Sequence, residues 1–321
     1  MFDNASIAIM YAVTPCHAGS GSALGVVDLP IQREKHTNWP MIQASGVKGA
    51  FRANFDRFAQ NNLQSEKIGE GQRKDFELLT QRIFGTDSYS YHDEKDKDEN
   101  NKPKKKLVDG GPSFAGSLSV SDAKILAYPM RSNVSPFVWI TCPAVLKRLS
   151  RDLEIAGKTG FDASAFSKAI TGENDAVILC GKESIKDKNI LLEDFEVTLK
   201  DTSIPEFDKI KDYFKDAERL LLVSDDVFNY GVTDCTQIMA QIKIEAETGT
   251  TKDGSLRYQE ELPSDTIMYT VVHWGASKNS AEEKLQADTI KKFITEEVIK
   301  SHIQIAGDET CGRGIFQLEW K

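Results

Sequence analysis

The stretch QIMAQIKIEAETGTTKDGSLRYQEELP, residues 237–263, alternates apolar and polar side chains on both sides of a polar, glycine-containing segment. Ile238, Ala240, Ile242 and Ile244 fall on one side of an extended chain. The run SLRYQEEL can return antiparallel to them after ETGTTKDG. The pattern predicts a long β-hairpin over 237–263 with a polar tip.

Strand and helix patterns interleave along the rest of the chain. The segments SIAIMYAVTP (6–15) and PFVWITCP (136–143) are rich in β-forming residues and end at prolines, which predicts strands. From Ser45 onward, apolar residues at spacings of four, four and three predict a helix that Ser45 would cap; they are Val47, Phe51, Phe55 and Phe58. Since we find neither a tandem repeat nor regular strand–helix–strand alternation, the sequence predicts an α+β fold rather than a doubly wound parallel sheet.

The tract DEKDKDENNKPKKK, residues 93–106, contains almost no apolar side chains. Such a composition predicts a mobile loop on the surface, and blocks of opposite charge are usually solvated. Its lysines could also contact a nucleic acid.

Composition limits where the chain works and what it binds. No segment approaches the roughly 20 apolar residues that cross a bilayer. The start, MFDNASIAIMYAV, lacks the pattern of a signal peptide, so we expect a cytoplasmic protein with no membrane partner. A net charge of −9 argues against nucleic acid, but residues 31–60 carry five Lys or Arg against two acids. One region can therefore hold an anion.

The stretch HAGSGSALGVVDLPIQRE, residues 17–34, contains a glycine-rich loop that is neither a P-loop nor a dinucleotide fingerprint. It lacks the Gly-Lys-Ser/Thr ending of the first, and its glycine spacing and the following VVDLP do not fit the second. Gly19 and Gly21 could still let a polynucleotide backbone come close.

The segment SGVKGAFR, residues 45–52, places Lys48 in the first turn of the predicted helix. A cation there is unfavourable because the helix dipole already makes that end positive. An anion beside it would resolve the conflict, and Ser45, Lys48, Arg52 and the free N–H groups could form a phosphate cradle. The alternative is a solvated basic face.

Asp28 and His17 flank the glycine loop. Asp28 could be a turn-forming aspartate that accepts from nearby backbone N–H groups, and His17 a packing histidine. If both line one cleft with the basic helix, the arrangement suits RNA cleavage. A carboxylate or imidazole would take the 2′-hydroxyl proton, or the carboxylate would hold a metal ion, while the cations neutralise the phosphate.

Two further segments carry candidate RNA contacts. GDETCGRG, residues 307–314, places Gly312, Arg313 and Gly314 in a turn that fits close approach to a phosphate, or equally a tight hairpin that requires positive φ. In the predicted hairpin, Tyr258 and Glu260 are either surface decoration or an RNA contact, with the aromatic ring stacked on a base.

Taken together, the motifs resemble a known family. The segments TPCHAGSGSALGVVDLPIQRE, SGVKGAFR, GSLSVSDAKILAYPMRS with FVWITCP, GSLRYQEELP and GDETCGRG are similar, in order and over nearly the whole chain, to the repeated backbone subunit of the type III-B CRISPR effector complex, a member of the RAMP superfamily. The resemblance implies a single domain over 1–321 with a modified ferredoxin-like, RNA-recognition-type palm. It also implies a finger-like insertion over 61–135 and a projecting thumb hairpin over 237–263.

The resemblance further implies an antiviral endoribonuclease that binds guide RNA, stacks with copies of itself in a filament, and joins other subunits of the complex. It would cut complementary target RNA at regular intervals, with Asp28 required and a divalent metal ion, magnesium or manganese, supporting the reaction. Lys48 and Arg52 would hold guide phosphates, and His17 would border the same cleft. The alternative is a filament subunit that holds guide RNA without cutting. Arg257 departs from the family pattern, which often has an aromatic residue there, and the insertion 93–106 has no clear counterpart.

Overall fold

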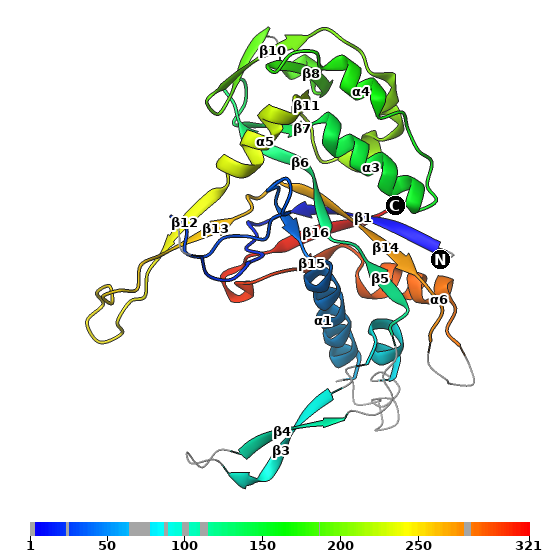
Figure 1. The fold of residues 1–321 in the computed structure, drawn as a ribbon, viewed down its shortest axis with the longest axis vertical. Coiled ribbons are helices and arrows are strands. Elements are labelled where there is room, and N and C mark those ends of the chain that lie inside the picture. Colours follow the sequence, from blue (N-terminus) through cyan, green and yellow to red (C-terminus); the bar gives the residue numbers. More distant parts are fainter. Residues whose placement is uncertain are drawn as a thin grey trace. The chain divides into compact units, whose positions relative to one another are not determined.

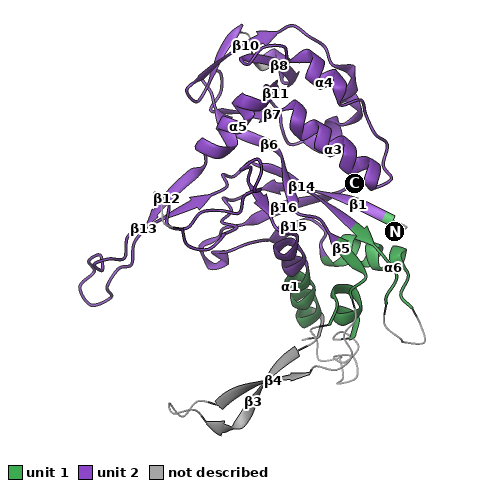
Figure 2. Cartoon of the chain, in the orientation of Figure 1, with its two compact units in different colours: residues 1–4, 52–119, 273–298 green, residues 5–51, 120–272, 299–321 purple. Residues whose placement is uncertain are grey.

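The structure is a computed structural model that describes residues 4–23, 26–63, 78–86, 89–97, 103–109, 115–185, 187–278 and 284–321. The chain forms two compact units (Figure 2). The single domain over 1–321 implied by the resemblance stays a prediction. The larger unit comprises residues 5–51, 120–272 and 299–321. The smaller unit comprises residues 1–4, 52–119 and 273–298.

A twelve-stranded mixed sheet runs through the described residues (Figure 1). Its main path is β15 (His302–Gln304), β16 (Ile315–Trp320), β1 (Asn4–Ala12), β14 (Ile267–Trp274), β6 (Ala123–Arg131), β7 (Phe137–Thr141), β11 (Leu220–Val223), β8 (Asp175–Cys180), β10 (Phe195–Lys200) and β9 (Asn189–Leu192). The short strands β2 (Met41–Ile42) and β5 (Leu118–Val120) complete it. Two pairs, β7 with β11 and β8 with β10, are parallel, whereas β1 with β16 and β6 with β14 are antiparallel. The predicted α+β class is confirmed.

The helices of the larger unit pack apolar side chains into its core. The helix α3 (Pro143–Ile155) begins at a proline and buries Val145, Leu146, Leu149 and Leu153. The helix α5 (Asp225–Asp234) is capped by the Ser224 hydroxyl, which accepts from the Val227 N–H. The other helical elements described in this unit are α4 (Ser164–Ala169) and the short helical turns η1 (Lys182–Ser184), η2 (Pro205–Lys209), η3 (Lys211–Phe214) and η5 (Glu309–Cys311).

The helix predicted from Ser45 is α1 (Ala44–Leu63). Val47, Phe51 and Phe55 are fully buried as predicted. Ser45 does not cap it, because the helix already begins at Ala44, whose N–H donates to the Asp122 carboxylate at 2.7 Å. The start of α1 is therefore capped by an acid from a distant part of the chain.

The smaller unit is held by aromatic packing. The ring of Phe293 packs edge-on against Phe55 and Phe58 at 6.0 and 5.8 Å, and Phe55 also packs against Phe84. Phe84 ends a helical segment over residues 78–84. The helix α6 (Ala287–Lys292) runs directly into the π-helical turn η4 (Phe293–Val298). The predicted finger-like insertion, 61–135, overlaps this unit from 61 to 119.

The charged tract 93–106 lies mostly in strands. β3 (Tyr89–Lys97) pairs antiparallel with β4 (Pro103–Asp109), so residues 93–97 and 103–106 belong to a two-stranded hairpin where a loop was expected. Residues 98–102 lie outside the described residues. Local composition missed these strands because the backbone pairing of two segments cannot be read from the composition of either one.

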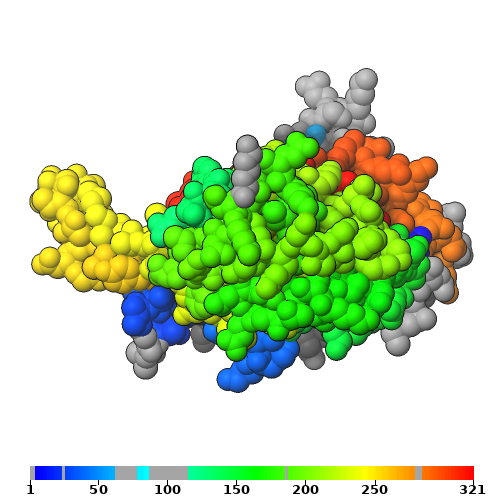
Figure 3. Space-filling model, turned by 90° about the horizontal axis from the view of Figure 1, so that it is seen from above, coloured from blue at the N-terminus to red at the C-terminus, as the bar shows by residue number. Residues whose placement is uncertain are grey.

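The hairpin predicted over 237–263 is present. β12 (Gln237–Gln241) pairs antiparallel with β13 (Arg257–Glu261), with Ala240 opposite Tyr258. Figure 3 shows this segment, in yellow, standing out from the surrounding surface of the larger unit. We call β12, β13 and the residues between them the projecting hairpin. The projecting hairpin has an exposed apolar surface made of five large side chains, of which Ile238 and Tyr258 share one face of the paired strands; the five are Ile238, Ile242, Ile244, Leu256 and Tyr258.

Among the described residues, no helix combines the length and the apolar character needed to span a membrane.

Candidate functional site

Asp28 lies along the free edge of β13. The Tyr258 N–H donates to Asp28 Oδ2 at 2.7 Å, the Leu29 N–H donates to the Tyr258 carbonyl at 3.0 Å, and the Glu260 N–H donates to the Leu29 carbonyl at 2.9 Å. Leu29 thus forms an isolated parallel bridge with Gln259, and the Asp28 side chain binds the same edge. Asp28 is solvent-exposed, so the structure places its carboxylate at the base of the projecting hairpin and accessible to a ligand.

His17 binds the same edge two residues further along. Its Nδ1 lies 2.7 Å from the Glu260 carbonyl oxygen. Because a carbonyl only accepts, Nδ1 carries the proton in the neutral ring and Nε2 is left as an acceptor. Tyr258 and Glu260 are two residues apart, roughly 7 Å along a strand. The structure therefore brings the two predicted catalytic residues onto neighbouring positions of one strand edge.

Gly19 makes room for the His17 ring. A Cβ built at Gly19 would lie 2.8 Å from His17 Nε2, closer than real Cβ contacts. Gly21 has φ of +104°, which favours glycine, and its surroundings are open. The glycines thus serve two needs, the placement of His17 and a left-handed backbone.

Gln32 joins the glycine loop to the start of α1. Its Nε2 donates to the Gly19 carbonyl at 3.1 Å, and its Oε1 accepts from the Gln43 N–H at 2.8 Å. The predicted neighbourhood of loop and helix is therefore real. Sequence reasoning missed Gln32 because a lone glutamine in an irregular segment carries no motif.

The basic face of α1 is partly balanced within the chain. Ser45 is exposed, and Lys48 and Arg52 are half-buried on successive turns. An anion near Lys48 was predicted from sequence, and the Asp122 carboxylate bound to the Ala44 N–H supplies one at this end of the helix. The Asp122 carboxylate thus supplies negative charge where an external phosphate was predicted, and Lys48 and Arg52 lie four residues apart on one face of α1.

Glu260 is not a surface contact, contrary to the prediction. It is 6% exposed, and its carboxylate accepts hydrogen bonds from Arg33 Nη2, the Thr236 hydroxyl and the Ile31 N–H. A buried carboxylate needs such partners, because an unpaired one is costly to desolvate. Glu260 therefore holds the loop against the hairpin.

Residues 307–314, the C-terminal turn, form a tight turn with positive φ, which was one of the two structures predicted for this segment. Gly312 and Gly314 have φ of +72° and +71°, and a Cβ at Gly314 would lie 2.0 Å from the Ile305 carbonyl oxygen. Arg313 Nε donates to Glu261 Oε1 at 2.9 Å, so its charge is engaged by a carboxylate of the hairpin.

The exposed aromatic predicted at the hairpin is present. Tyr258 is 41% exposed. Arg257 points to the other face, where Nε and Nη2 donate to Gln241 Oε1 at 3.0 and 2.9 Å. Both donors reach one amide oxygen, so Gln241 anchors the Arg257 guanidinium on this face of the hairpin.

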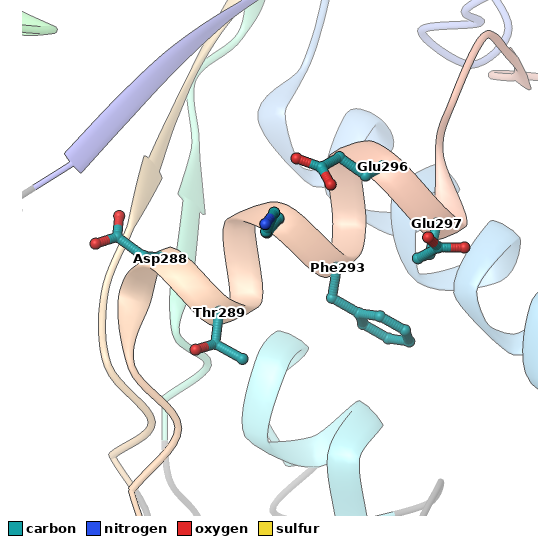
Figure 4. Close-up of a pocket in the computed structure, with 6 residues that line it drawn as sticks. Asp288, Thr289, Phe293, Glu296 and Glu297 are labelled. Atoms are coloured by element: carbon teal, nitrogen blue, oxygen red, sulfur yellow. The ribbon is translucent and has the colours of Figure 1, made fainter.

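A separate surface pocket occurs in the smaller unit over α6 and η4 (Figure 4). Figure 4 labels Asp288, Thr289, Phe293, Glu296 and Glu297 in its lining. None of the predicted site residues lines it. Across the described ranges, no group of three or more His, Cys, Asp or Glu side chains is arranged to hold a metal ion.

Comparisons with known proteins identify relatives over almost the full length. A family profile described as the RAMP superfamily matches residues 9–317. The CRISPR system Cmr endoribonuclease Cmr4 of Pyrococcus furiosus is 32% identical over 322 residues, which cover 97% of this chain and 94% of that protein. A crystal structure of oligomeric Cmr4 from Pyrococcus furiosus has a TM-score of 0.62 at 24% identity and 99% coverage of both chains. A chain of the type III-B Cmr-beta complex bound to cognate target RNA has a TM-score of 0.66 at 20% identity, covering 99% of this chain and 98% of that chain.

Proposed function

The chain belongs to the RAMP superfamily and, within it, to the Cmr4 family, and from this premise we propose that it is a guide-RNA-binding backbone subunit of a type III-B effector complex that cuts complementary target RNA. The relative with 32% identity is named an endoribonuclease. The observation that carries the proposal for this chain is the exposed Asp28 carboxylate beside His17 at the base of the projecting hairpin.

Cleavage follows from the positions of these two side chains. His17 Nε2, the free acceptor of the ring, takes the proton of a target 2′-hydroxyl. The 2′-oxygen then attacks its own phosphorus and the bond from phosphorus to the 5′-oxygen breaks. The products are a 2′,3′-cyclic phosphate and a 5′-hydroxyl, which takes its proton from a water that regains one from the His17 imidazolium. Asp28 orients the attacking nucleotide, and Lys48 and Arg52 stabilise charge on nearby phosphates.

The projecting hairpin would act as the thumb of a ferredoxin-like palm. A nucleotide in an A-form helix holds its 2′-oxygen poorly placed for in-line attack, so pairing must be interrupted before cleavage. The exposed apolar surface and Tyr258 can displace bases and cover the splayed nucleotide. Because Asp28 lies at the base of this hairpin, distortion and cleavage would occur at one place.

Base pairing with the guide would choose the target sequence, while the protein contacts the backbone and reads its shape. A crystal structure of a relative is described as oligomeric. Copies of this chain stacked along the guide would repeat the site at fixed spacing, and other subunits of the complex would complete the assembly.

A divalent ion, magnesium or manganese, fits Asp28 as a single exposed protein ligand. The Tyr258 N–H binds Oδ2 of Asp28, so Oδ1 is the oxygen that would bind the ion. Mg²⁺ is commonly held by one or two carboxylates together with phosphates and water, so RNA would supply the remaining ligands. When bound, the ion would neutralise charge that develops on the phosphate.

Asp28→Ala in a complex assembled with guide RNA tests the proposal. We expect target cleavage to be lost while guide and target binding are kept. The matched control is Asp201→Ala, an exposed aspartate paired with Lys182, which should cut as the wild type does. If the Asp28→Ala complex still cuts at the regular positions, the chain is a filament scaffold and cleavage belongs elsewhere.

A further inference from the structure

Three consecutive polar residues at the base of the projecting hairpin are buried. Gln259, Glu260 and Glu261 are 2%, 6% and 1% exposed. Successive residues of a strand point to opposite faces, so Gln259 and Glu261 share one face and Glu260 lies on the other. Buried carboxylates are stable only when they are paired, and their partners identify what holds the hairpin in place.

The face with Gln259 and Glu261 is held by the C-terminal turn, Gly307–Gly314. Arg313 Nε donates to Glu261 Oε1 at 2.9 Å, and Gln259 Nε2 donates to Asp308 Oδ2 at 2.5 Å. Two residues of the turn therefore bind two positions of β13. A pair of attachment points resists rotation of the strand as well as translation.

The same turn is fixed to the segment that carries His17. The Gly314 N–H donates to the Pro15 carbonyl at 2.8 Å, and the Gly307 N–H donates to the His17 carbonyl at 3.2 Å. Close approach of Gly314 to the Ile305 carbonyl leaves no room for a side chain. The turn therefore touches both the predicted catalytic segment and the hairpin.

The opposite face of β13 is held by Glu260. Its carboxylate pairs with Arg33, whose Nη1 also donates to the Val232 carbonyl near the end of α5 at 3.0 Å. The base of the hairpin is thus clamped on both faces, by Arg33 on one and by Arg313 on the other.

We propose that the C-terminal turn is a positioning element for cleavage, in which Arg313 and Asp308 fix the direction of the projecting hairpin and, through β13, the placement of Asp28 and His17. The inference rests on the proposed function, because it assigns these residues to that reaction. It gives Arg313 a positioning role in place of the phosphate contact predicted from sequence.

Loss of the clamp should lower the cleavage rate more than RNA binding. Replacing Arg313 with Met removes the cation that pairs with the buried Glu261 carboxylate and leaves it the longer hydrogen bond from Gln237 Nε2 at 3.3 Å, so the strand must shift to hydrate the charge. A displacement of about 1 Å at reacting groups can cost about 100-fold in rate. The basic face of α1 is unchanged by this substitution, so affinity for RNA should stay close to that of the wild type.

The experiment compares Arg313→Met, Arg313→Lys and wild type in the complex assembled with guide RNA. For Arg313→Met we expect a 10- to 100-fold slower single-turnover cleavage, target affinity within about twofold, and faster hydrogen exchange in β12 and β13. Arg313→Lys should restore most of the rate. Arg131→Met, which breaks an exposed ion pair with Glu193, is the matched control and should change none of the three.

Two results would overturn the inference. One is wild-type cleavage and wild-type exchange in Arg313→Met. The other is weaker RNA binding with a smaller salt dependence and unchanged exchange, which would make Arg313 a phosphate contact. If Arg313→Met does not assemble, Asp308→Ala serves as the second variant, because it leaves no buried charge behind. It should slow cleavage and speed exchange in the same way but more weakly. Wild-type cleavage and exchange in Asp308→Ala would equally overturn the inference. Failure of the proposed function can be distinguished from failure of this inference. The first would be seen as target cleavage by the Asp28→Ala complex, whereas the second is read from hydrogen exchange, which needs no cleavage.

Discussion

The Tyr258 N–H donates a hydrogen bond to the Asp28 carboxylate at 2.7 Å and so joins the glycine loop to a strand 230 residues away. All five residues of β13 lie opposite residues of β12, and the N–H and carbonyl groups of Tyr258 and Glu260 also bind Asp28, Leu29 and His17. One strand thus serves both the hairpin and the site. Any movement of the hairpin is transmitted to Asp28.

Asp28→Asn separates the charge of this residue from its hydrogen bond. The amide oxygen can still accept from the Tyr258 N–H, so the loop should stay in place and the thermal stability should change little. Without the negative charge, the complex should lose at least about 100-fold in target cleavage. Single-turnover cleavage and a melting curve check both parts. Cleavage near the wild-type rate would show that Asp28 acts only through its bond to the backbone.

Gly19→Ala should displace the His17 ring. The new Cβ would lie 2.8 Å from Nε2, and Nδ1 is held by the Glu260 carbonyl, so the ring must give up that bond. We expect a loss of about 1 kcal/mol in stability and a clear fall in cleavage rate. Gly160→Ala meets only ordinary contacts with Glu154 and is the control. Unchanged cleavage by Gly19→Ala would remove His17 from the mechanism.

Local periodicity predicted the parts of the fold that depend on neighbours in sequence. The hairpin pairing and the buried face of α1 follow from spacings of two and of three to four residues. The cap of α1 could not be predicted in this way, because Asp122 lies 78 residues from Ala44 in the sequence and nothing near Ser45 indicates that contact.

The sequence identified the residues that could carry the chemistry of the site, but not the residues that hold them in place. Asp28, His17 and the glycine loop carry recognisable residue types, and the structure brings them to one strand edge. Glu260 was assigned to RNA because an acid beside an exposed Tyr258 looks like surface. Only the tertiary fold supplies Arg33 as its partner and buries it.

Asp175 should give the larger unit an acid-sensitive contribution to stability. Burial opposes its charge, but hydrogen bonds from Lys200 and Thr171 outweigh burial and lower the carboxyl pKa from 3.8 to about 2. A carboxyl pKa that is lower in the folded than in the unfolded state stabilises the fold at any pH above the unfolded-state pKa. This stabilisation is lost as the pH falls through the folded-state pKa of about 2. Asp175→Asn should therefore cost about 2 kcal/mol of unfolding free energy at pH 7.

Urea unfolding of wild type and Asp175→Asn between pH 7 and pH 2 measures this contribution. The difference in unfolding free energy between the two proteins should narrow below about pH 4 and close near pH 2. Asp201→Asn is the control, because Asp201 is 92% exposed in its pair with Lys182, and an exposed pair contributes little. A gap that stays constant with pH would mean that packing, not the charge of Asp175, is responsible.

Lys48→Gln should weaken RNA binding and flatten its salt dependence. Each phosphate contact to a single strand adds about 0.7 to the slope of log affinity against log salt concentration, so the slope should decrease by about that amount. Lys182→Gln, a surface lysine paired with Asp201, should leave the slope unchanged. Asp122 sharpens the test, because its carboxylate sits at the same helix end and would repel a phosphate bound there. Asp122→Asn should then bind RNA more tightly than wild type at low salt, whereas unchanged slopes in both variants would place the guide backbone away from the start of α1.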